Sequence, residues 1–190
     1  MQKSNLHPVR SQLIGVQNGQ HLPDEELDQL LRINIGQVEA GLELPTILRR
    51  YGSQHLVYQG DLSYHYFRKL YHLLEPFEYR SVLDIGSGYG RLVLYGATLY
   101  PGRSFHGIEL IEERAQASRR SVSALHLPNV EIKTGDAGQL EWPKVDCICI
   151  MNTFFKDILQ SVLSKLEQLA RKQPFLLATV SAGNLLIEQV

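Results

Sequence analysis

The sequence predicts an α/β fold, in which a doubly wound and mostly parallel sheet follows an N-terminal helical extension. Short apolar runs alternate with helical segments after Tyr79, and such alternation favours parallel strands with helices on both faces. A glycine-rich turn follows the first apolar run, where a buried strand of this kind of sheet would pass into a helix.

The composition fits one globular domain of this class. Of 190 residues, 44% are hydrophobic and 21% charged, and 19 basic against 20 acidic side chains leave a net charge of −1. A chain of this length buries roughly 70% of its unfolded surface, so its core needs no disulfide or metal. The near-neutral balance offers no broad footprint for nucleic acid or an anionic membrane. Because no stretch approaches the ~18 apolar residues of a membrane span, we expect a cytoplasmic protein without a membrane partner.

The N-terminal third is predicted to be helical after a loose arm. Residues 1–20 show no periodicity and are expected to form that arm. Apolar residues at helical spacing predict one helix over 24–41, and a short second helix begins at Pro45. Asp61 can cap a further helix, which Pro76 ends.

The rest of the chain alternates between strands and helices. Strands are predicted at 81–85, 104–110, 130–133, 145–151 and 175–180, and helices at 91–100, 112–126 and 157–172. We divide the chain into an arm with a helical cap, 1–60, and a core, 61–190. Cys147 and Cys149 lie two apart on a strand and are expected to be buried thiols on one face. They show no zinc spacing and the seven histidines are scattered, so we predict no metal site.

The glycine-rich turn is the most informative segment for function. In doubly wound sheets, ligands bind where the first strand leaves the sheet. Glycines at 86, 88 and 90 permit backbone conformations closed to other residues and let a ligand approach the main chain. The third glycine comes one residue earlier than in the dinucleotide-binding pattern, and Asp84 precedes the first by two. This aspartate suits a cationic ligand better than a phosphate.

The pattern Asp84-x-Gly86-x-Gly88-x-Gly90 resembles the first motif of the class I S-adenosylmethionine-dependent methyltransferases. The resemblance implies a Rossmann-like sheet, S-adenosylmethionine as cofactor and S-adenosylhomocysteine as product. It implies cofactor binding by Tyr58, Asp84, Gly86, Ser87, Gly88, Gly90, Glu109, Leu110, Asp136 and Ala137.

Three predicted site residues lie at strand ends. In the family, an acid at the position of Glu109 accepts both ribose hydroxyls, and one at the position of Asp136 bonds the adenine amino group. Asn152 ends the fourth strand, beside the place of the transferable methyl. Glu109 alone could be a solvated strand end and Asp136 an ordinary turn residue, so their joint placement carries the inference.

Within that superfamily, residues 58–184 resemble the Dot-one type of histone-lysine methyltransferase. The resemblance includes the tyrosine loop at Tyr58, Glu141-Trp142 before the fourth strand, and the asparagine-aromatic motif of Asn152 and Phe154. Thr153 departs from the second asparagine of that motif. The same segment also resembles the Asn-Pro-Pro-aromatic signature of methyltransferases that act on bases or glutamine, although both prolines are missing.

Both resemblances imply nitrogen as the methylated atom. An amide oxygen can accept a hydrogen bond from the attacking N–H while an aromatic face packs against the acceptor, which assigns catalytic roles to Asn152 and Phe154. Tyr58, Tyr64 and Tyr89 are expected nearest this site. We predict direct in-line transfer to a protein or small amine, since the net charge argues against a chromatin substrate. The alternatives are a nucleic-acid base N-methyltransferase and a methyltransferase-like cofactor-binding or interaction module without activity.

The C-terminus is expected to leave the sheet incomplete. The family's sheet ordinarily has seven strands, of which the last two form an antiparallel pair, but residues 184–190 allow one short strand. Either the chain is truncated or a partner completes the sheet. An exposed edge would also permit a homodimer.

Overall fold

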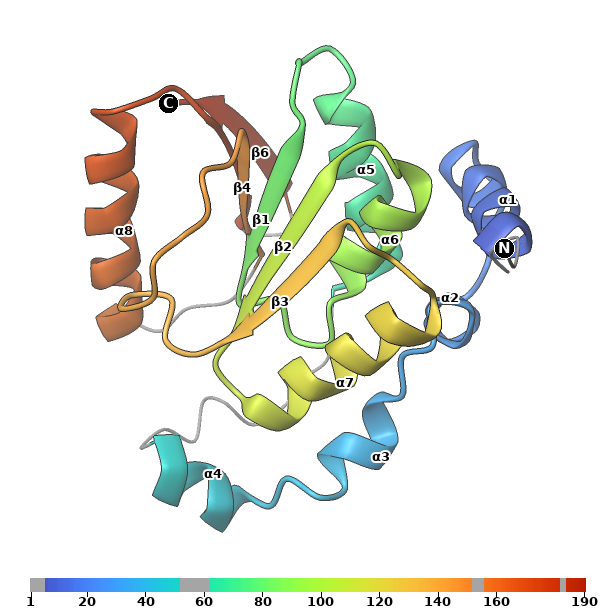
Figure 1. Cartoon of the computed structure of the whole chain (residues 1–190), viewed down its shortest axis with the longest axis horizontal. Helices are drawn as coiled ribbons and strands as arrows, with labels where there is room; N and C mark the ends of the chain where they lie inside the picture. The colour runs from blue at the N-terminus through green and yellow to red at the C-terminus, as the bar shows by residue number, and fades with distance from the viewer. Residues whose placement is uncertain (1–5, 52–61, 152–155, 182–183) are drawn as a thin grey trace.

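The computed structural model describes residues 6–51, 62–151, 156–181 and 184–190 and contains a six-stranded sheet flanked by helices (Figure 1). The strands are β1 (Ser81–Ile85), β2 (Ser104–Glu109), β3 (Val130–Thr134), β4 (Cys147–Met151), β5 (Leu176–Ser181) and β6 (Asn184–Gln189). They lie in the order β3-β2-β1-β4-β5-β6, where the first five are parallel to their neighbours and β6 is antiparallel to β5. The predicted fold class is confirmed.

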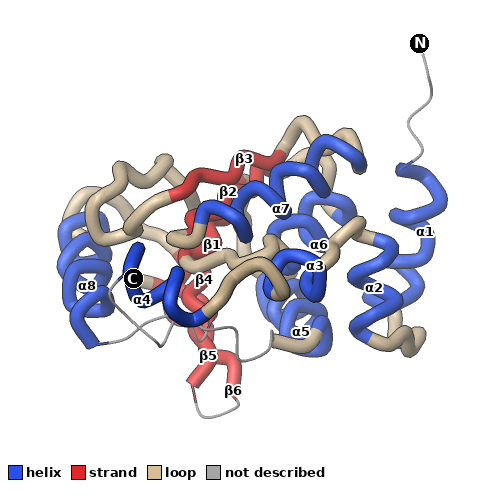
Figure 2. The backbone as a smooth tube through the Cα atoms, turned by 90° about the horizontal axis from the view of Figure 1, so that it is seen from below, coloured by secondary structure: helices blue, strands red, loops and turns tan. Residues whose placement is uncertain are grey.

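Helices cover both faces of this sheet. They are α1 (Leu6–Gln17), α2 (Asp24–Leu30), α3 (Ile35–Glu39), α4 (Leu44–Tyr51), α5 (Tyr64–Leu74), α6 (Arg91–Leu99), α7 (Glu112–Ala124) and α8 (Lys156–Ala170). Helices α5, α6 and α7 lie on one face and α8 on the other (Figure 2). β1 has the predicted ends, and the other predicted core elements differ from the observed ones by one or two residues at an end.

The core has one large apolar cluster on each face of the sheet. Alternation along β1 sends Val82 to the cluster with Tyr71 and Phe105, and Leu83 to the cluster with Val162 of α8. Cys147 and Cys149 are both fully buried on the first of these faces, as predicted, with their Sγ atoms 4.0 Å apart.

The prediction of a loose arm is wrong from residue 6 onward. The chain there forms helix α1, which packs on α6. Its buried stripe is narrow and centres on Leu13 and Val16, which gives little periodic signal in a short segment. Polar contacts add to the packing. The Tyr95 hydroxyl donates to Gln17 Oε1 at 3.0 Å, and Arg10 donates to the Leu99 carbonyl at 3.3 Å.

The helix predicted over 24–41 is also corrected, since the chain forms α2 and α3 with a turn between them. Arg32 in that turn has a φ of 59°, in the left-handed region. Asn34 then caps α3 by accepting a hydrogen bond from the Gln37 N–H at 3.3 Å. The predicted cap of α5, Asp61, lies outside the described residues. Ser63 caps that helix by accepting from the His65 N–H.

The C-terminal segment forms one of the two strands that the family resemblance led us to expect. β6 pairs with β5 from Leu176↔Gln189 to Ser181↔Asn184. Among the described helices, none is both long and apolar enough to cross a membrane.

Candidate cofactor site

The glycine turn follows β1 at the carboxyl edge of the parallel strands. Gly86, Gly88 and Gly90 all have positive φ, at 78°, 54° and 79°, in the region where a side chain is strained. The N–H groups of Gly86 and Ser87 both donate to the Ile108 carbonyl, at 2.7 and 2.9 Å. The backbone of the turn therefore contacts the end of β2.

Glu109 joins the end of β2 to this turn through its carboxylate. Its side chain is buried, Oε2 accepts from the Gly88 N–H at 2.8 Å, and Oε1 accepts from the Ile111 N–H at 2.9 Å. A carboxylate offers about four lone-pair sites, and these two bonds engage both of its oxygens. The predicted role in binding a ribose diol is compatible with this arrangement, which also fixes the direction of the side chain.

Ser87 supplies a buried polar atom inside the turn. Its Oγ has no hydrogen-bond partner among the described residues, which is unusual for a buried hydroxyl. A Cβ added at Gly107 of β2 would lie 2.7 Å from this oxygen, so Gly107 provides the space that the serine occupies. The Ser87 hydroxyl can both donate and accept a hydrogen bond, so it suits a polar ligand bound in the turn.

Asp84 lies within β1 rather than in the turn. It is buried, and in the register it pairs with Gly107 on β2 and Cys149 on β4. The hydrogen bond to Cys147, burial and the nearby charges of Cys147 and Asp84 raise the pKa of Cys149, so the thiol stays protonated. Asp84 thus places negative charge at the start of the turn, where a cationic group would be favoured.

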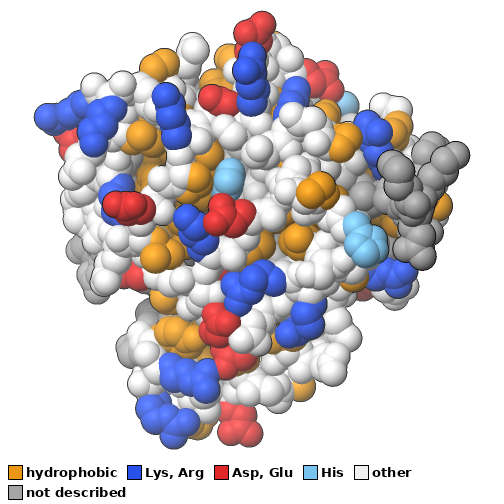
Figure 3. Space-filling model, in the orientation of Figure 1, with side chains coloured by type: hydrophobic (Ala, Val, Ile, Leu, Met, Phe, Trp, Pro, Cys, Tyr) orange, Lys and Arg blue, Asp and Glu red, His pale blue; other side chains and the backbone are white. Residues whose placement is uncertain are grey.

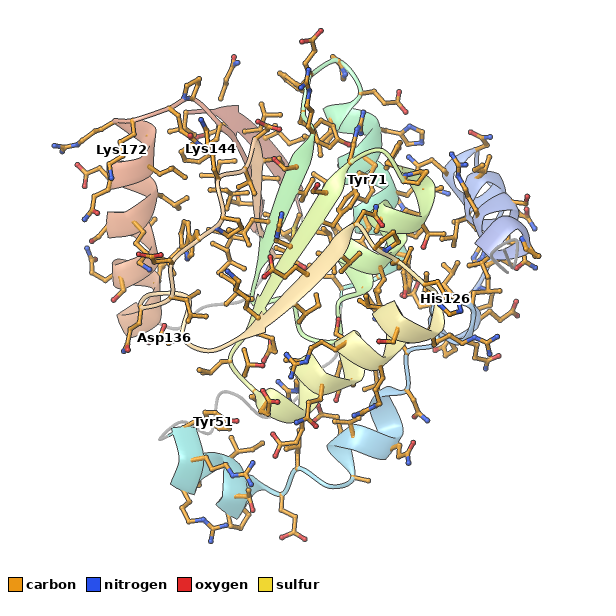
Figure 4. All side chains as sticks on the ribbon, viewed as in Figure 1. Tyr51, Tyr71, His126, Asp136, Lys144 and Lys172 are labelled. Carbon is orange, nitrogen blue, oxygen red and sulfur yellow. The ribbon has the colours of Figure 1, made fainter. Side chains whose placement is uncertain are left out.

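The turn after β3 holds Asp136 at the same edge of the sheet, on the side of α8 (Figure 4). Asp136 is half-buried, and its Oδ1 accepts from the Gly138 N–H at 2.7 Å, which leaves Oδ2 for another donor. Ala137 is buried, and its carbonyl accepts from Trp142 Nε1 at 2.9 Å. Leu110 is half-buried beside Glu109.

The structure does not test the positions of the other predicted site residues. Tyr58, Asn152 and Phe154 lie outside the described residues. Tyr64 and Tyr89 are buried, with their hydroxyls bonded to Asp28 and Glu39, and their expected place near the methyl group stays a prediction.

Sequence reasoning missed the acidic side chains of the helical cap. Asp28 of α2 and Glu39 of α3 bond residues that flank Gly90. Their only sequence signal is an acid beside the apolar stripe of a short helix, and this does not identify the partner.

Helix α4 lies beyond the carboxyl ends of β1 and β2 (Figure 1), where the Glu112 N–H donates to the Tyr51 hydroxyl at 3.4 Å. The described residues include no cluster of three His, Cys, Asp or Glu side chains suited to a metal ion.

An open parallel sheet with a glycine turn after its first strand and an acid at the end of its second is typical of Rossmann-like domains, a fold in which ligands bind at this edge. Residues 82–173 match the sequence model of a methyltransferase domain. The match covers just under half of the chain and includes the glycine turn, Glu109 and Asp136.

Several solved structures align with this chain. A precorrin-6y C5,15-methyltransferase from Geobacter metallireducens aligns with a TM-score of 0.51 and 15% identity, over 64% of this chain and 63% of that one. An S-adenosylmethionine-dependent methyltransferase from Aquifex aeolicus aligns with a TM-score of 0.48 and 24% identity, over 63% and 72% of the two chains. PKMT2 from Rickettsia typhi, in complex with AdoHcy, aligns at 0.47 with 23% identity, over 53% of this chain but only 20% of its own length.

The finer resemblance is not supported. These matches do not favour the Dot-one type of histone-lysine methyltransferase over other class I enzymes. No curated protein matches the sequence.

Proposed function

We propose that this protein transfers a methyl group from S-adenosylmethionine to a nitrogen of a protein or small amine acceptor. The observation that carries the cofactor part is the bond from the Gly88 N–H to the buried Glu109 carboxylate, which joins the two elements expected to hold the nucleoside. The nitrogen acceptor rests on the sequence pattern Asn152-Thr153-Phe154-Phe155.

The chain's own residues divide the work of binding. The Glu109 carboxylate accepts the ribose hydroxyls, Asp136 Oδ2 accepts the adenine amino group, and the glycine turn with Ser87 receives the amino-acid portion. When bound, the cofactor supplies an electrophilic sulfonium methyl. Asn152 and Phe154 orient the acceptor, which must arrive as a neutral amine, and alignment alone can contribute roughly 7–11 kcal/mol to lowering the barrier.

The surface charge favours a protein or small amine over nucleic acid. Basic and acidic side chains are interspersed on the face shown in Figure 3, without a continuous basic stripe over it. With a net charge of −1, the chain offers little of the phosphate neutralisation that drives nucleic-acid binding.

Cofactor binding is tested by calorimetric titration with S-adenosylhomocysteine. Glu109→Gln replaces one acceptor oxygen by an N–H donor facing the turn, and we expect the Kd to rise at least tenfold, by about 1.4 kcal/mol or more. Gly88→Arg should abolish binding, because a bulky residue is strained at a φ of 54°. Glu131→Gln, at an exposed carboxylate on β3, should bind as the wild type does. Absence of binding by the wild type would refute the proposed function.

The acceptor is tested by incubating the protein with cell extract and cofactor labelled in the methyl group. Label in protein or small amines supports the proposal. Label in RNA or DNA would instead support the base N-methyltransferase. Intact cofactor binding without transfer to any fraction would favour a binding module.

A further inference from the structure

The helical cap is tied to the glycine turn by two acidic side chains. Arg91 follows Gly90, and its Nε donates to Asp28 Oδ1 at 2.7 Å while a terminal N–H group donates to Oδ2. Tyr89 precedes Gly90, and its hydroxyl donates to Glu39 Oε1 at 2.5 Å. Both neighbours of the third turn glycine are thus held by residues that lie 50 and 63 positions away in the sequence.

These contacts are largely withdrawn from solvent, which strengthens them. The side chains of Arg91 and Asp28 are 11% and 12% exposed, and those of Arg114 and Glu39 are 11% and 17% exposed. Arg114 donates to both oxygens of Glu39, at 2.7 and 3.2 Å. In such surroundings charged hydrogen bonds are less screened than at the surface, and losing one partner leaves the other uncompensated.

Protonation states agree with this geometry. Burial and the hydrogen bond to Glu39 raise the pKa of Tyr89, so it remains a neutral donor. Burial alone would lower the pKa of Arg114, but the hydrogen bonds and charge of Glu39 outweigh it and the pKa is raised. Glu39 therefore meets one neutral and one cationic donor at once.

A turn built on glycine needs such support. Glycine loses more conformational freedom on folding than any other residue, and three of the five positions from Gly86 to Gly90 are glycines at positive φ. When a binding-competent conformation is only partly populated, the apparent affinity falls by that fraction. Fixing Tyr89 and Arg91 from outside restrains the turn in addition to the bond between Gly88 and Glu109.

We propose that Asp28 and Glu39 are positioning residues that hold the cofactor turn in its binding geometry, so that segment 24–39 sets cofactor affinity. This inference rests on the proposed binding of S-adenosylmethionine. It assigns the segment a role at the cofactor rather than at the methyl acceptor, because its buried carboxylates bond the turn itself.

The test is titration with S-adenosylhomocysteine at a temperature where circular dichroism shows each variant of the full chain to be folded. Glu39→Gln keeps the size of the side chain but removes its negative charge. With the amide oxygen in the place of Oε1, its N–H group faces the terminal N–H group of Arg114. We expect its Kd to rise on the order of tenfold, within the 5- to 150-fold range of ordinary coupling between sites. Asp28→Asn should act in the same direction. Glu26→Gln, an exposed acid in the same segment, should bind as the wild type does.

A double-mutant cycle distinguishes positioning from a general loss of stability. Tyr89→Phe should also weaken binding, and in the Glu39→Gln background its further effect on the Kd should be smaller than in the wild type. If Glu39→Gln and Asp28→Asn lower the unfolding temperature but bind with the wild-type Kd, the two acids only stabilise the fold and the inference is overturned. If the wild type itself fails to bind, the proposed function fails first.

Discussion

At the scale of single residues, two glycines inside helices have opposite surroundings. A Cβ at Gly96 in α6 would collide with the Tyr71 hydroxyl and lie 2.5 Å from Phe105 Cε1. A Cβ at Gly36 in α3 would meet no atom within 4 Å. Both positions look alike in the sequence, since each is a single glycine within an apolar helical pattern. Only the packing of α5 and β2 against α6 tells them apart.

We therefore expect the same substitution to have opposite effects at these positions. Gly96→Ala overfills a closed core and should lower the free energy of unfolding by about 1–3 kcal/mol. Gly36→Ala should raise it by about 0.4–1 kcal/mol, because alanine restricts the unfolded chain without strain in the helix. Urea denaturation of the two variants measures both changes. If both variants changed the free energy of unfolding in the same direction, the packing around Gly96 would not explain the effect of its substitution.

At the scale of elements, agreement between sequence and structure follows the source of the signal. β1 was predicted with its ends, because an apolar run followed by glycines is a local signal. A single helix was predicted over 24–41, where the chain forms α2 and α3. The apolar period continues through the turn between them, in which Arg32 is left-handed. Asn34, counted as a helical position, is instead the residue that starts α3.

The cap of α3 gives a direct prediction. Asn34→Ala removes the side-chain acceptor for the Gln37 N–H and should cost about 1 kcal/mol of the free energy of unfolding, measured in urea. Asn34→Asp keeps an acceptor oxygen and is the matched control, expected within about 0.5 kcal/mol of the wild type. A full-sized loss in the aspartate variant would contradict a capping role, since the acceptor would still be present.

The candidate site was predictable in the same partial way. The turn, Glu109 and Asp136 were predicted from the sequence and lie at one edge of the sheet, because parallel strands end at one edge and bring their following residues together. The contacts of Glu39 with Tyr89 and Arg114 span 50 and 75 positions and depend on how the cap folds back onto α6 and α7. No local pattern encodes that return, so the cap's role at the turn required the structure.

At the scale of the whole molecule, buried hydroxyls and thiols set the response to alkaline pH. Burial is the largest cause of the raised pKa of Tyr71, Tyr79, Tyr89 and Tyr95. A folded-state pKa above the unfolded one means that the unfolded chain releases protons first as pH rises. The stabilisation from these groups is complete below the unfolded tyrosine pKa of about 10 and is lost progressively above it.

We expect unfolding at alkaline pH to coincide with tyrosine ionisation, and Tyr79→Phe to shift the midpoint upward. The Tyr79 hydroxyl is buried without a hydrogen-bond partner among the described residues, so removing it breaks no described hydrogen bond and deletes one group that favours the unfolded state at high pH. Arg103, 3.9 Å from the ring centroid, can still pack on phenylalanine. Phenolate absorbance and far-ultraviolet circular dichroism, followed together through the titration, give both transitions.

Tyr95→Phe is the comparison. It removes a similar group but also the bond to Gln17, so this variant should lose stability at neutral pH. A Tyr79→Phe midpoint at or below that of the wild type would contradict the argument, since the deleted proton could then not have driven unfolding.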